Sequence, residues 1–243
     1  MQQLIEPTEN ACCFRAALKD IPDTSVVYAK PKVVGEYSVT TERDVVIGRK
    51  NLRLLNESLV GKCNINLDLC DGYENFVKKD DVVCEALDPF LKWISASIPR
   101  NVGLKEFCDA DIVCNRGLLK KVASFPYGYR DHDCFHLVAV KFRSVIFMYD
   151  FYTEKILRQL RSPKKMDDLL LYYGFHFEKL VTLPLDFEPN NVKEEPVNNC
   201  EQFFCVSRTT LETAKKKLRI LLSAEVDCIN SSPVSYQHYS RVL

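Results

Sequence analysis

The sequence predicts an α+β fold with a mixed, largely antiparallel central sheet that is flanked by helices. After short β-rich patches, helical hydrophobic patterns are followed by a strand hairpin, and a further helix and a second hairpin complete the order. Such an order is typical of α+β domains with a central sheet. The chain has 243 residues, 47% of them hydrophobic and 27% charged, and shows neither a repeat nor a clear linker. We therefore expect a single globular domain over residues 1–243.

The first part of the chain indicates strands followed by a helix. Residues 26–28 and 36–39 contain the β-branched and aromatic side chains that favour strands. Residues 80–98 then carry apolar side chains at helical spacing. Pro89 interrupts this run, so we expect a kink there, and Pro99 is expected to end the helix.

A helix is also expected over residues 110–124, and the clearest strand pattern follows it. Residues 134–140 and 145–152 are rich in Val, Ile, Phe and Tyr, and Arg143 and Ser144 lie at their connection. Two β-rich runs that are joined by so short a connection predict a β-hairpin.

The next segment combines a helix, a strand and a loop. Residues 164–173 have a helical pattern, and Gly174 is suited to end a helix at its C′ position. We expect residues 176–181 to form a strand. The polar residues 187–201 are expected to form an exposed loop.

Two acidic residues lie near the end of the last predicted hairpin, which pairs residues 203–210 with 217–228. The period of two in a strand places the carboxylates of Glu225 and Asp227 on one face, where they repel each other unless a cation lies between them. A hard divalent ion such as Mg²⁺ or Mn²⁺ is the usual cation in such a pair. The alternative is a solvated strand end, which is the commoner place for isolated acidic residues.

A third carboxylate belongs to the segment Gly-Phe-His-Phe-Glu at 174–178. If this segment is a strand, its two Phe side chains enter the core, and His176 and Glu178 point to the other side. They would then lie beside Glu225 and Asp227, provided that the strands are neighbours. The alternative is an ordinary surface glutamate and a structural histidine.

A cationic segment completes the candidates for chemistry. Arg116 is followed by a lysine pair, Lys120 and Lys121, and these side chains suit a phosphate group. A solvated helix face is the alternative. His132 and His136 have the i, i+4 spacing of zinc ligands but no third ligand nearby. The sequence has no P-loop, no GxSxG and no HExxH motif.

Charge and cysteine usage limit the environment and the partners. Lys+Arg and Asp+Glu both total 33, so any nucleic-acid contact must use a local basic patch. The 11 cysteines are irregularly spaced and form no CxxC pair, and the first residues do not have the pattern of a signal peptide. We therefore expect free thiols in a reducing compartment. No apolar run is long enough for a membrane span.

Taken in order, these motifs and several weaker ones resemble the decapping exoribonuclease family, often called DXO/RAI-type proteins. Their collinear order carries the resemblance, which covers about residues 30–230. The matching segments are Gly35–Val39 with Arg43, 66–73 (similar to the family's NFDLxxGY), 79–81, 85–88, 115–117, 125–127, the hairpin that ends at Thr153, 174–178, 204–206 and 224–228.

The resemblance implies a fold related to the PD-(D/E)xK nucleases and a divalent-metal site, for Mg²⁺ or Mn²⁺, in a pocket that takes an RNA 5′ end. It implies metal-dependent hydrolysis of phosphodiester bonds at the 5′ ends of incompletely capped, NAD-capped or 5′-monophosphate RNA. The partners implied are RNA 5′ ends and a 5′→3′ exoribonuclease, with neither a membrane nor DNA expected. The setting implied is mRNA quality control in the nucleus, extending to the cytoplasm.

The resemblance also implies roles for individual residues. Glu178 and Asp227 correspond to direct metal ligands, and Glu225 to a catalytic residue of the same cluster that faces water or substrate. Arg116 corresponds to the family's phosphate-binding arginine. Further substrate contacts are implied at Arg43, Glu85 and Cys205.

The end of the chain departs from the family pattern. In the family a Glu-x-Lys motif follows on the next strand, whereas residues 228–243 contain neither Glu nor Lys. We therefore expect a C-terminally truncated member, with a fold that is incomplete at the C-terminus and a weaker metal site. Three alternatives stay open: an active nuclease, a catalytically inactive RNA 5′-end binder or partner subunit of a 5′→3′ exonuclease, and a product that folds poorly.

Overall fold

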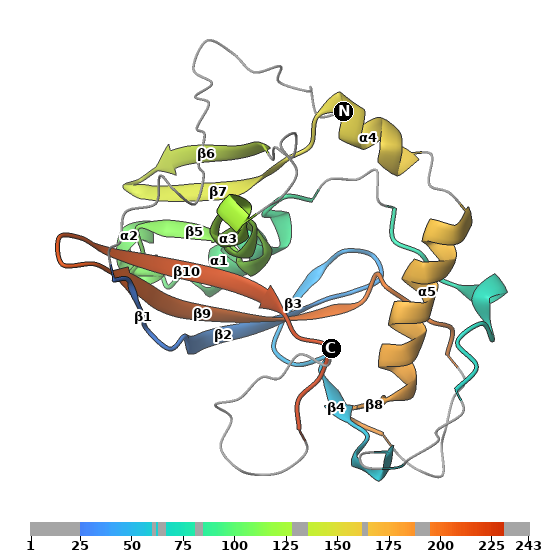
Figure 1. The fold of residues 1–243 in the computed structure, drawn as a ribbon. Coiled ribbons are helices and arrows are strands. Elements are labelled where there is room, and N and C mark those ends of the chain that lie inside the picture. The colour runs from blue at the N-terminus through green and yellow to red at the C-terminus, as the bar shows by residue number, and fades with distance from the viewer. Residues whose placement is uncertain are drawn as a thin grey trace.

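A computed structural model describes residues 25–59, 62, 67–80, 85–127, 136–161, 165–187 and 195–230 (Figure 1). The strands are β1 (Val27–Tyr28), β2 (Lys32–Val39), β3 (Val45–Ile47), β4 (Arg53–Leu55), β5 (Ile112–Asn115), β6 (His136–Phe142), β7 (Val145–Phe151), β8 (Thr182–Pro184), β9 (Gln202–Glu212) and β10 (Lys217–Glu225). The α-helices are α1 (Asp88–Ser97), α2 (Leu104–Cys108), α3 (Arg116–Ser124), α4 (Glu154–Arg161) and α5 (Lys165–Leu180). Short 3-10 helices cover Glu57–Leu59, Tyr73–Asn75 and Phe125–Tyr127.

The main sheet has eight strands in the order β3-β2-β9-β10-β5-β7-β6, and β1 also pairs with β9. In this sheet, as far as the described residues go, the parallel pairs are those of β5, with β10 on one side and β7 on the other. A second sheet pairs β4 with β8 in antiparallel fashion. The prediction of an α+β fold around a mixed, largely antiparallel sheet is therefore confirmed.

Apolar side chains cover both faces of the central strands. On one face, Phe90, Trp93 and Ile94 of α1 pack against the sheet. On the other face, Leu118 of α3 packs against Ile220 of β10 and their neighbours. Residues of β10 are buried on both sides for this reason, since helices cover both faces of the parallel β5–β10 pair.

The helix predicted over residues 80–98 is shorter than expected. Within the described residues, α1 begins at Asp88, so Pro89 lies in its first turn and causes no kink. Proline is accepted there because its missing N–H has no partner in the helix anyway. The helix expected over 110–124 was wrong in its first part, because residues 112–115 form β5 between β7 and β10.

The segment after residue 164 differs most from expectation. Helix α5 runs from Lys165 through Gly174 to Leu180, so the strand predicted over 176–181 was wrong. The last part of the expected loop 187–201 is a loop, but the expectation that it is exposed was wrong, because Val197 and Cys200 are buried. Residues 188–194 lie outside the described residues.

Both predicted hairpins are confirmed. Strands β6 and β7 pair directly, and Arg143 and Ser144 at their turn have φ angles of 44° and 64°. Positive φ at both central residues gives the turn whose twist matches that of the strands. Strands β9 and β10 form the second hairpin, and β10 ends at Glu225. In the described part of the chain, no helix is long and apolar enough to cross a membrane.

Candidate active site

The candidate site lies where β2, β9 and β10 end beside one another. The register aligns Tyr37 with Phe204, and Phe204 with Glu225, so these side chains share one face of the sheet. The Tyr37 and Phe204 rings stack with their centroids 4.9 Å apart, and the Tyr37 hydroxyl lies 2.7 Å from Ser223 Oγ. Burial raises the pKa of Tyr37, so its hydroxyl stays protonated and this side of the site is uncharged.

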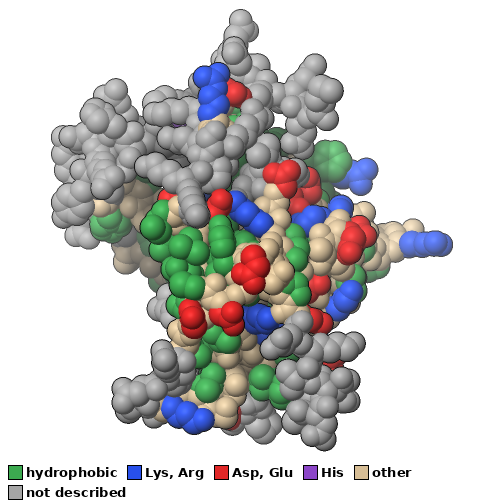
Figure 2. All heavy atoms as spheres, turned by 90° about the vertical axis from the view of Figure 1, so that its right-hand side faces the viewer, with side chains coloured by type: hydrophobic (Ala, Val, Ile, Leu, Met, Phe, Trp, Pro, Cys, Tyr) green, Lys and Arg blue, Asp and Glu red, His purple; other side chains and the backbone are tan. Residues whose placement is uncertain are grey.

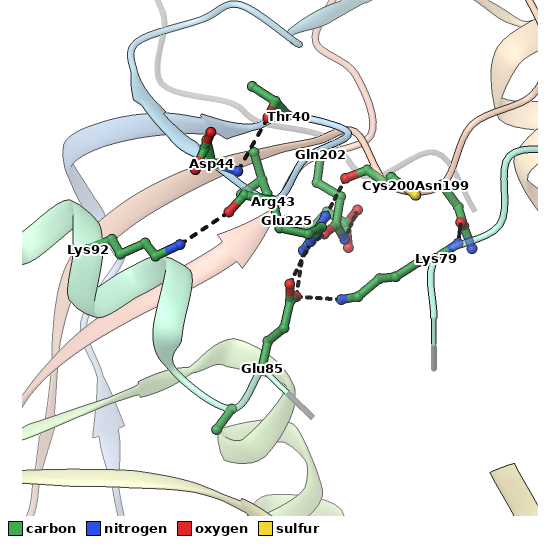
Figure 3. A network of polar contacts seen from close by, with 12 residues as sticks. Thr40, Arg43, Asp44, Lys79, Glu85, Lys92, Asn199, Cys200, Gln202 and Glu225 are labelled. Carbon is green, nitrogen blue, oxygen red and sulfur yellow. Dashed lines mark hydrogen bonds and ion pairs between the residues drawn. The ribbon is translucent and has the colours of Figure 1, made fainter. Parts of the chain in front are cut away.

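A line of charged and polar side chains leads to Glu225 (Figure 3). Arg43 holds both carboxylate oxygens of Glu85 at 2.5 Å and donates from Nη2 to Gln202 Oε1 at 2.9 Å. Gln202 Nε2 in turn donates to Glu225 Oε1 at 2.9 Å. Lys79 Nζ donates to Glu85 Oε2 at 2.6 Å, the oxygen that also accepts from Arg43 Nη2. The contacts thus form a continuous network in which Lys79, Glu85 and Arg43 alternate in charge. Gln202 connects this network to Glu225.

The turn between β2 and β3 aims Arg43 into this line. Arg43 has a φ of 65°, and its backbone N–H donates to Thr40 O at 2.9 Å, which closes the turn. Its Nη1 also donates to the carbonyl of Cys200. These contacts use four of the five guanidinium N–H groups. Most hydrogen-bond donors of Arg43, a predicted substrate contact, therefore bind groups of the protein itself.

Glu85, the second predicted substrate contact, is held as a carboxylate. Burial alone would raise the pKa of Glu85, but the hydrogen bonds from Arg43 and Lys79 outweigh burial and lower that pKa. The side chain of Glu85 is 16% exposed. Its ion pairs with Arg43 and Lys79 are therefore less screened by water than surface pairs are.

Arg116 reaches the same edge of the sheet by another path. Because β5 and β10 are parallel and Asn115 is aligned with Ser223, their carboxyl ends meet at one edge. Glu225 ends β10 there, and the exposed Arg116 begins α3 directly after β5. Asn115 Nδ2 donates to Ala86 O at 3.2 Å, which ties this edge to the segment that carries Glu85. An exposed arginine at a helix N-terminus suits a phosphate group.

The segments that carry Glu178 and Asp227 are linked through the β4–β8 sheet. The chain beyond β10 pairs with β4, since Leu55 N donates to Ile229 O at 2.8 Å. Leu55 is aligned with Thr182 of β8, whose Oγ1 donates to the carbonyl of Glu178 at 2.6 Å. The pKa of Cys228 is raised to about 11, chiefly by burial and also by the negative charges of Asp227 and Glu178. Two of the predicted metal ligands thus belong to segments that the fold joins, the end of α5 and the end of the β9–β10 hairpin.

Arg53, which was not among the predicted site residues, holds the end of α5 in place. Its half-buried guanidinium donates from Nε to Thr182 Oγ1 at 2.6 Å and from Nη2 to Thr182 O at 3.2 Å. Thr182 Oγ1 donates to the backbone carbonyl of Glu178 at 2.6 Å. The backbone carbonyl of Arg53 also accepts from Ile229 N at 3.0 Å. No pattern around Arg53 in the sequence signals this position.

Cys205 and His176 lie away from this line. Cys205 is 4% exposed, and its side chain packs with Leu52, Phe203 and Val226 on the face of β9 opposite to Phe204 and Glu225. His176 is buried in α5, with Nδ1 at 3.2 Å from Leu69 O. The structure therefore places neither side chain beside Glu225, and His176 has the structural role that was its alternative. His132 lies outside the described residues.

The donor set suits a hard divalent cation. Glu178, Glu225 and Asp227 offer carboxylate oxygens, which are the ligands that Mg²⁺ and Mn²⁺ prefer. Within the described ranges, no three Asp, Glu, His or Cys side chains are already arranged as a metal-binding group. Figure 2 shows the side of the molecule that lies to the right in Figure 1, where acidic and basic side chains are interspersed among apolar ones.

Comparisons with known proteins identify the family. The family model described as RAI1 like PD-(D/E)XK nuclease matches residues 29–241. The decapping nuclease dom-3 of Caenorhabditis elegans is 31% identical over 206 residues, which are 82% of this chain and 51% of that protein. The human decapping and exoribonuclease protein is 26% identical, over 86% of this chain and 52% of its own length. The chain spans about half the length of these relatives.

Solved structures agree in fold. Rai1 of Scheffersomyces stipitis has a TM-score of 0.65 and 20% identity, over 87% of this chain and 60% of that structure. Candida albicans Rai1, solved in complex with pU5-Mn2+, has a TM-score of 0.62 and 20% identity, over 88% of this chain and 57% of that structure. The S. stipitis protein was also solved with (3'-NADP)+ and calcium ion. The family model, which matches most of the chain, shows that the chain belongs to the RAI1-like PD-(D/E)XK nucleases.

Proposed function

We propose that this protein is a metal-dependent nuclease that removes the 5′ ends of incompletely capped, NAD-capped or 5′-monophosphate RNA by hydrolysing phosphodiester bonds. One observation supports the proposal: Glu225 ends β10 and Asp227 follows it, at the edge of the sheet where Arg116 begins α3, and the β4–β8 sheet links the segment of Glu178 to this end. Carboxylates beside an exposed arginine match the needs of a metal ion and a phosphate group. Membership in a nuclease family supports this proposal.

A divalent metal, Mg²⁺ or Mn²⁺, would be held by Glu178 and Asp227, with Glu225 in the same cluster. When bound, such an ion would stabilise the charge that develops on the phosphate during displacement. The metal ions in solved relatives, Mn²⁺ in one and calcium in another, support this choice. The donor chemistry of the three carboxylates supports it independently.

The residues of this chain divide the remaining work. Arg116 would bind the 5′ phosphate, because its guanidinium is exposed and can form two parallel hydrogen bonds with phosphate oxygens. Glu225 would accept a proton from the attacking water or orient that water. The stacked rings of buried Tyr37 and partly buried Phe204 would keep bulk water from one side of Glu225. Arg43 and Glu85 would form the side of the site that contacts the RNA.

The same proposal includes partners and location. RNA 5′ ends are the proposed ligands, which the pU5 complex of a family member supports. We further propose a 5′→3′ exoribonuclease as partner and a place in nuclear mRNA quality control that extends to the cytoplasm. We also propose that residues 1–243 act as a single domain.

The test uses purified chain with cap-labelled, NAD-capped and 5′-monophosphate RNA, in Mg²⁺, in Mn²⁺ and in EDTA. Glu225→Ala is the inactive comparison, and Glu212→Gln, an exposed residue at the far end of β9, is the matched control. We expect release of the 5′ group that needs metal, is lost in E225A and is unchanged in E212Q. Binding of RNA by a folded chain that releases nothing would instead identify a non-catalytic RNA 5′-end binder.

A further inference from the structure

The side chain of Gln202 lies between a cation and an anion. Its Oε1 accepts from Arg43 Nη2 at 2.9 Å, and its Nε2 donates to Glu225 Oε1 at 2.9 Å (Figure 3). Gln202 is the first residue of β9, two positions before Phe204, which is aligned with Glu225. The strand period and the register therefore place Gln202 diagonally opposite Glu225 on one face.

Both neighbours demand the same orientation of the Gln202 amide. A carboxylate accepts hydrogen bonds only, so the amide NH₂ must face Glu225. A guanidinium donates only, so the amide carbonyl must face Arg43. Arg43 is itself fixed by two bonds to Glu85 and one to the carbonyl of Cys200. The orientation of Gln202 is thus set by a side chain that has little freedom of its own.

We propose that Gln202 is a positioning residue that holds the carboxylate of Glu225 in its working orientation. The inference rests on the proposed function, because it assigns a role within that same site. Strand β10 ends at Glu225, so the sheet fixes the backbone there but leaves the side chain free to choose among rotamers. The hydrogen bond from Gln202 Nε2 to Oε1 restricts this choice of rotamer.

A double-mutant cycle in metal-free protein tests the contact. The chains are the wild type, Gln202→Met, Glu225→Met and the double variant, unfolded by urea at pH 7. Methionine has nearly the length of glutamine and glutamate but neither donates nor carries charge. We expect Q202M and E225M to be non-additive, with a coupling of about tenfold in the unfolding equilibrium constant. Additive effects would overturn the proposal.

Two functional measurements test the consequence. In RNA cleavage, Q202M is expected to lower kcat about tenfold and to leave KM within about twofold, since substrate contacts stay in place. In a Mn²⁺ titration without RNA, Q202M is expected to weaken binding about threefold, because Glu225 must then be ordered when the ion binds. The matched control is Glu201→Gln, the exposed neighbour whose Oε1 accepts from Thr41 Oγ1 at 3.0 Å, and it should behave as wild type.

The outcomes separate the two proposals. If the wild-type chain cleaves no RNA, the proposed function fails, and the cycle and the Mn²⁺ titration still decide on Gln202. If the wild type cleaves RNA and Q202M has the same kcat and the same Mn²⁺ affinity, the positioning role is wrong while the proposed function stands. A loss of activity explained by unfolding alone would appear as a lowered fraction of folded protein in the circular dichroism spectrum at the assay temperature.

Discussion

Trp93 fills the space in which a side chain at Gly35 would lie. A Cβ atom on Gly35 would stand 2.1 Å from Cζ2 of Trp93, and the Trp93 side chain is 4% exposed. Phe90 and Phe107 surround the indole, so it has no room to withdraw. The irregular pairing of β2 with β9 between Val33 and Gly35 lies at the same place. The sheet and α1 therefore meet at a point where only hydrogen fits.

Replacing this glycine should destabilise the fold. Gly35→Ala is expected to lower the free energy of unfolding by about 1–3 kcal/mol, because an overpacked core must shift backbone or ring. Urea unfolding measures it. The control is Gly117→Ala, where a Cβ would meet nothing within 4 Å and should be neutral or slightly stabilising. Equal stability of G35A and wild type would contradict the packing of Trp93 on β2.

Gly174 offers the opposite prediction. It lies inside α5 and is exposed, and a Cβ atom at this position would meet nothing within 4 Å. Gly174→Ala should raise the free energy of unfolding by about 0.5–1 kcal/mol, because glycine is a poor helix former. If α5 instead stopped at Gly174 in a left-handed C′ conformation, alanine would destabilise. The sign of the change in urea midpoint therefore distinguishes one continuous helix from a helix followed by a strand.

Glu85 should make stability depend on acid. Its pKa is lowered in the folded state, so its contribution is fully present above the unfolded value of about 4.3 and is lost as pH falls through the folded pKa. Glu85→Gln should lower stability at pH 7 and flatten the loss between about pH 4.3 and lower values. Urea midpoints from pH 7 to pH 3 measure both effects. If the urea midpoint of E85Q fell with pH as steeply as that of the wild type, the ion pair of Glu85 with Arg43 would not be the source of the acid dependence.

Arg116 should recognise a 5′ phosphate. Arg116→Ala is expected to weaken binding of 5′-phosphorylated RNA about tenfold or more while leaving 5′-hydroxyl RNA nearly unaffected, since a charge-assisted bond to phosphate contributes about 1.5–3 kcal/mol. Fluorescence anisotropy at one fixed salt concentration measures the ratio. Arg158→Ala, which removes an exposed arginine of α4, is the control for general loss of charge. An equal loss for both RNAs, or an equal loss in both variants, would argue against a phosphate contact.

The misassigned end of α5 shows where sequence patterns mislead. Phe175 and Phe177 alternate with polar residues and follow a glycine, which is a strand-like pattern. The structure instead buries Tyr172 and His176, which are one helical turn apart. Tyr172 packs edge-on against Tyr73 and Phe76, so contacts with a distant segment favour the helix. The spacing of apolar residues alone could not decide between a strand and a helix over so few residues.

The candidate site was only partly accessible from sequence. Glu225 and Asp227 were evident as carboxylates near a strand end, because local alternation is visible in the chain. Gln202 was not, because its role depends on the register of β9 with β10 and on the positive φ of Arg43. Both are properties of pairing between distant segments. Local alternation can therefore reveal a strand end such as that of β10, whereas cross-strand neighbours depend on residues far away in the chain.

The pairing of β2 with β9 has a consequence for how the site comes into being. The hydrogen bond between Tyr37 and Ser223 joins residues 186 positions apart, and Arg43 reaches the carbonyl of Cys200 across 157 positions. Contacts between residues so far apart in the sequence form slowly, because the entropy cost of closing the loop comes before the contact stabilises the fold. During synthesis, β2 leaves the ribosome long before its partner strand exists. The β9–β10 hairpin, whose own pairing is local, is therefore the element on whose emergence the assembly of the site must wait.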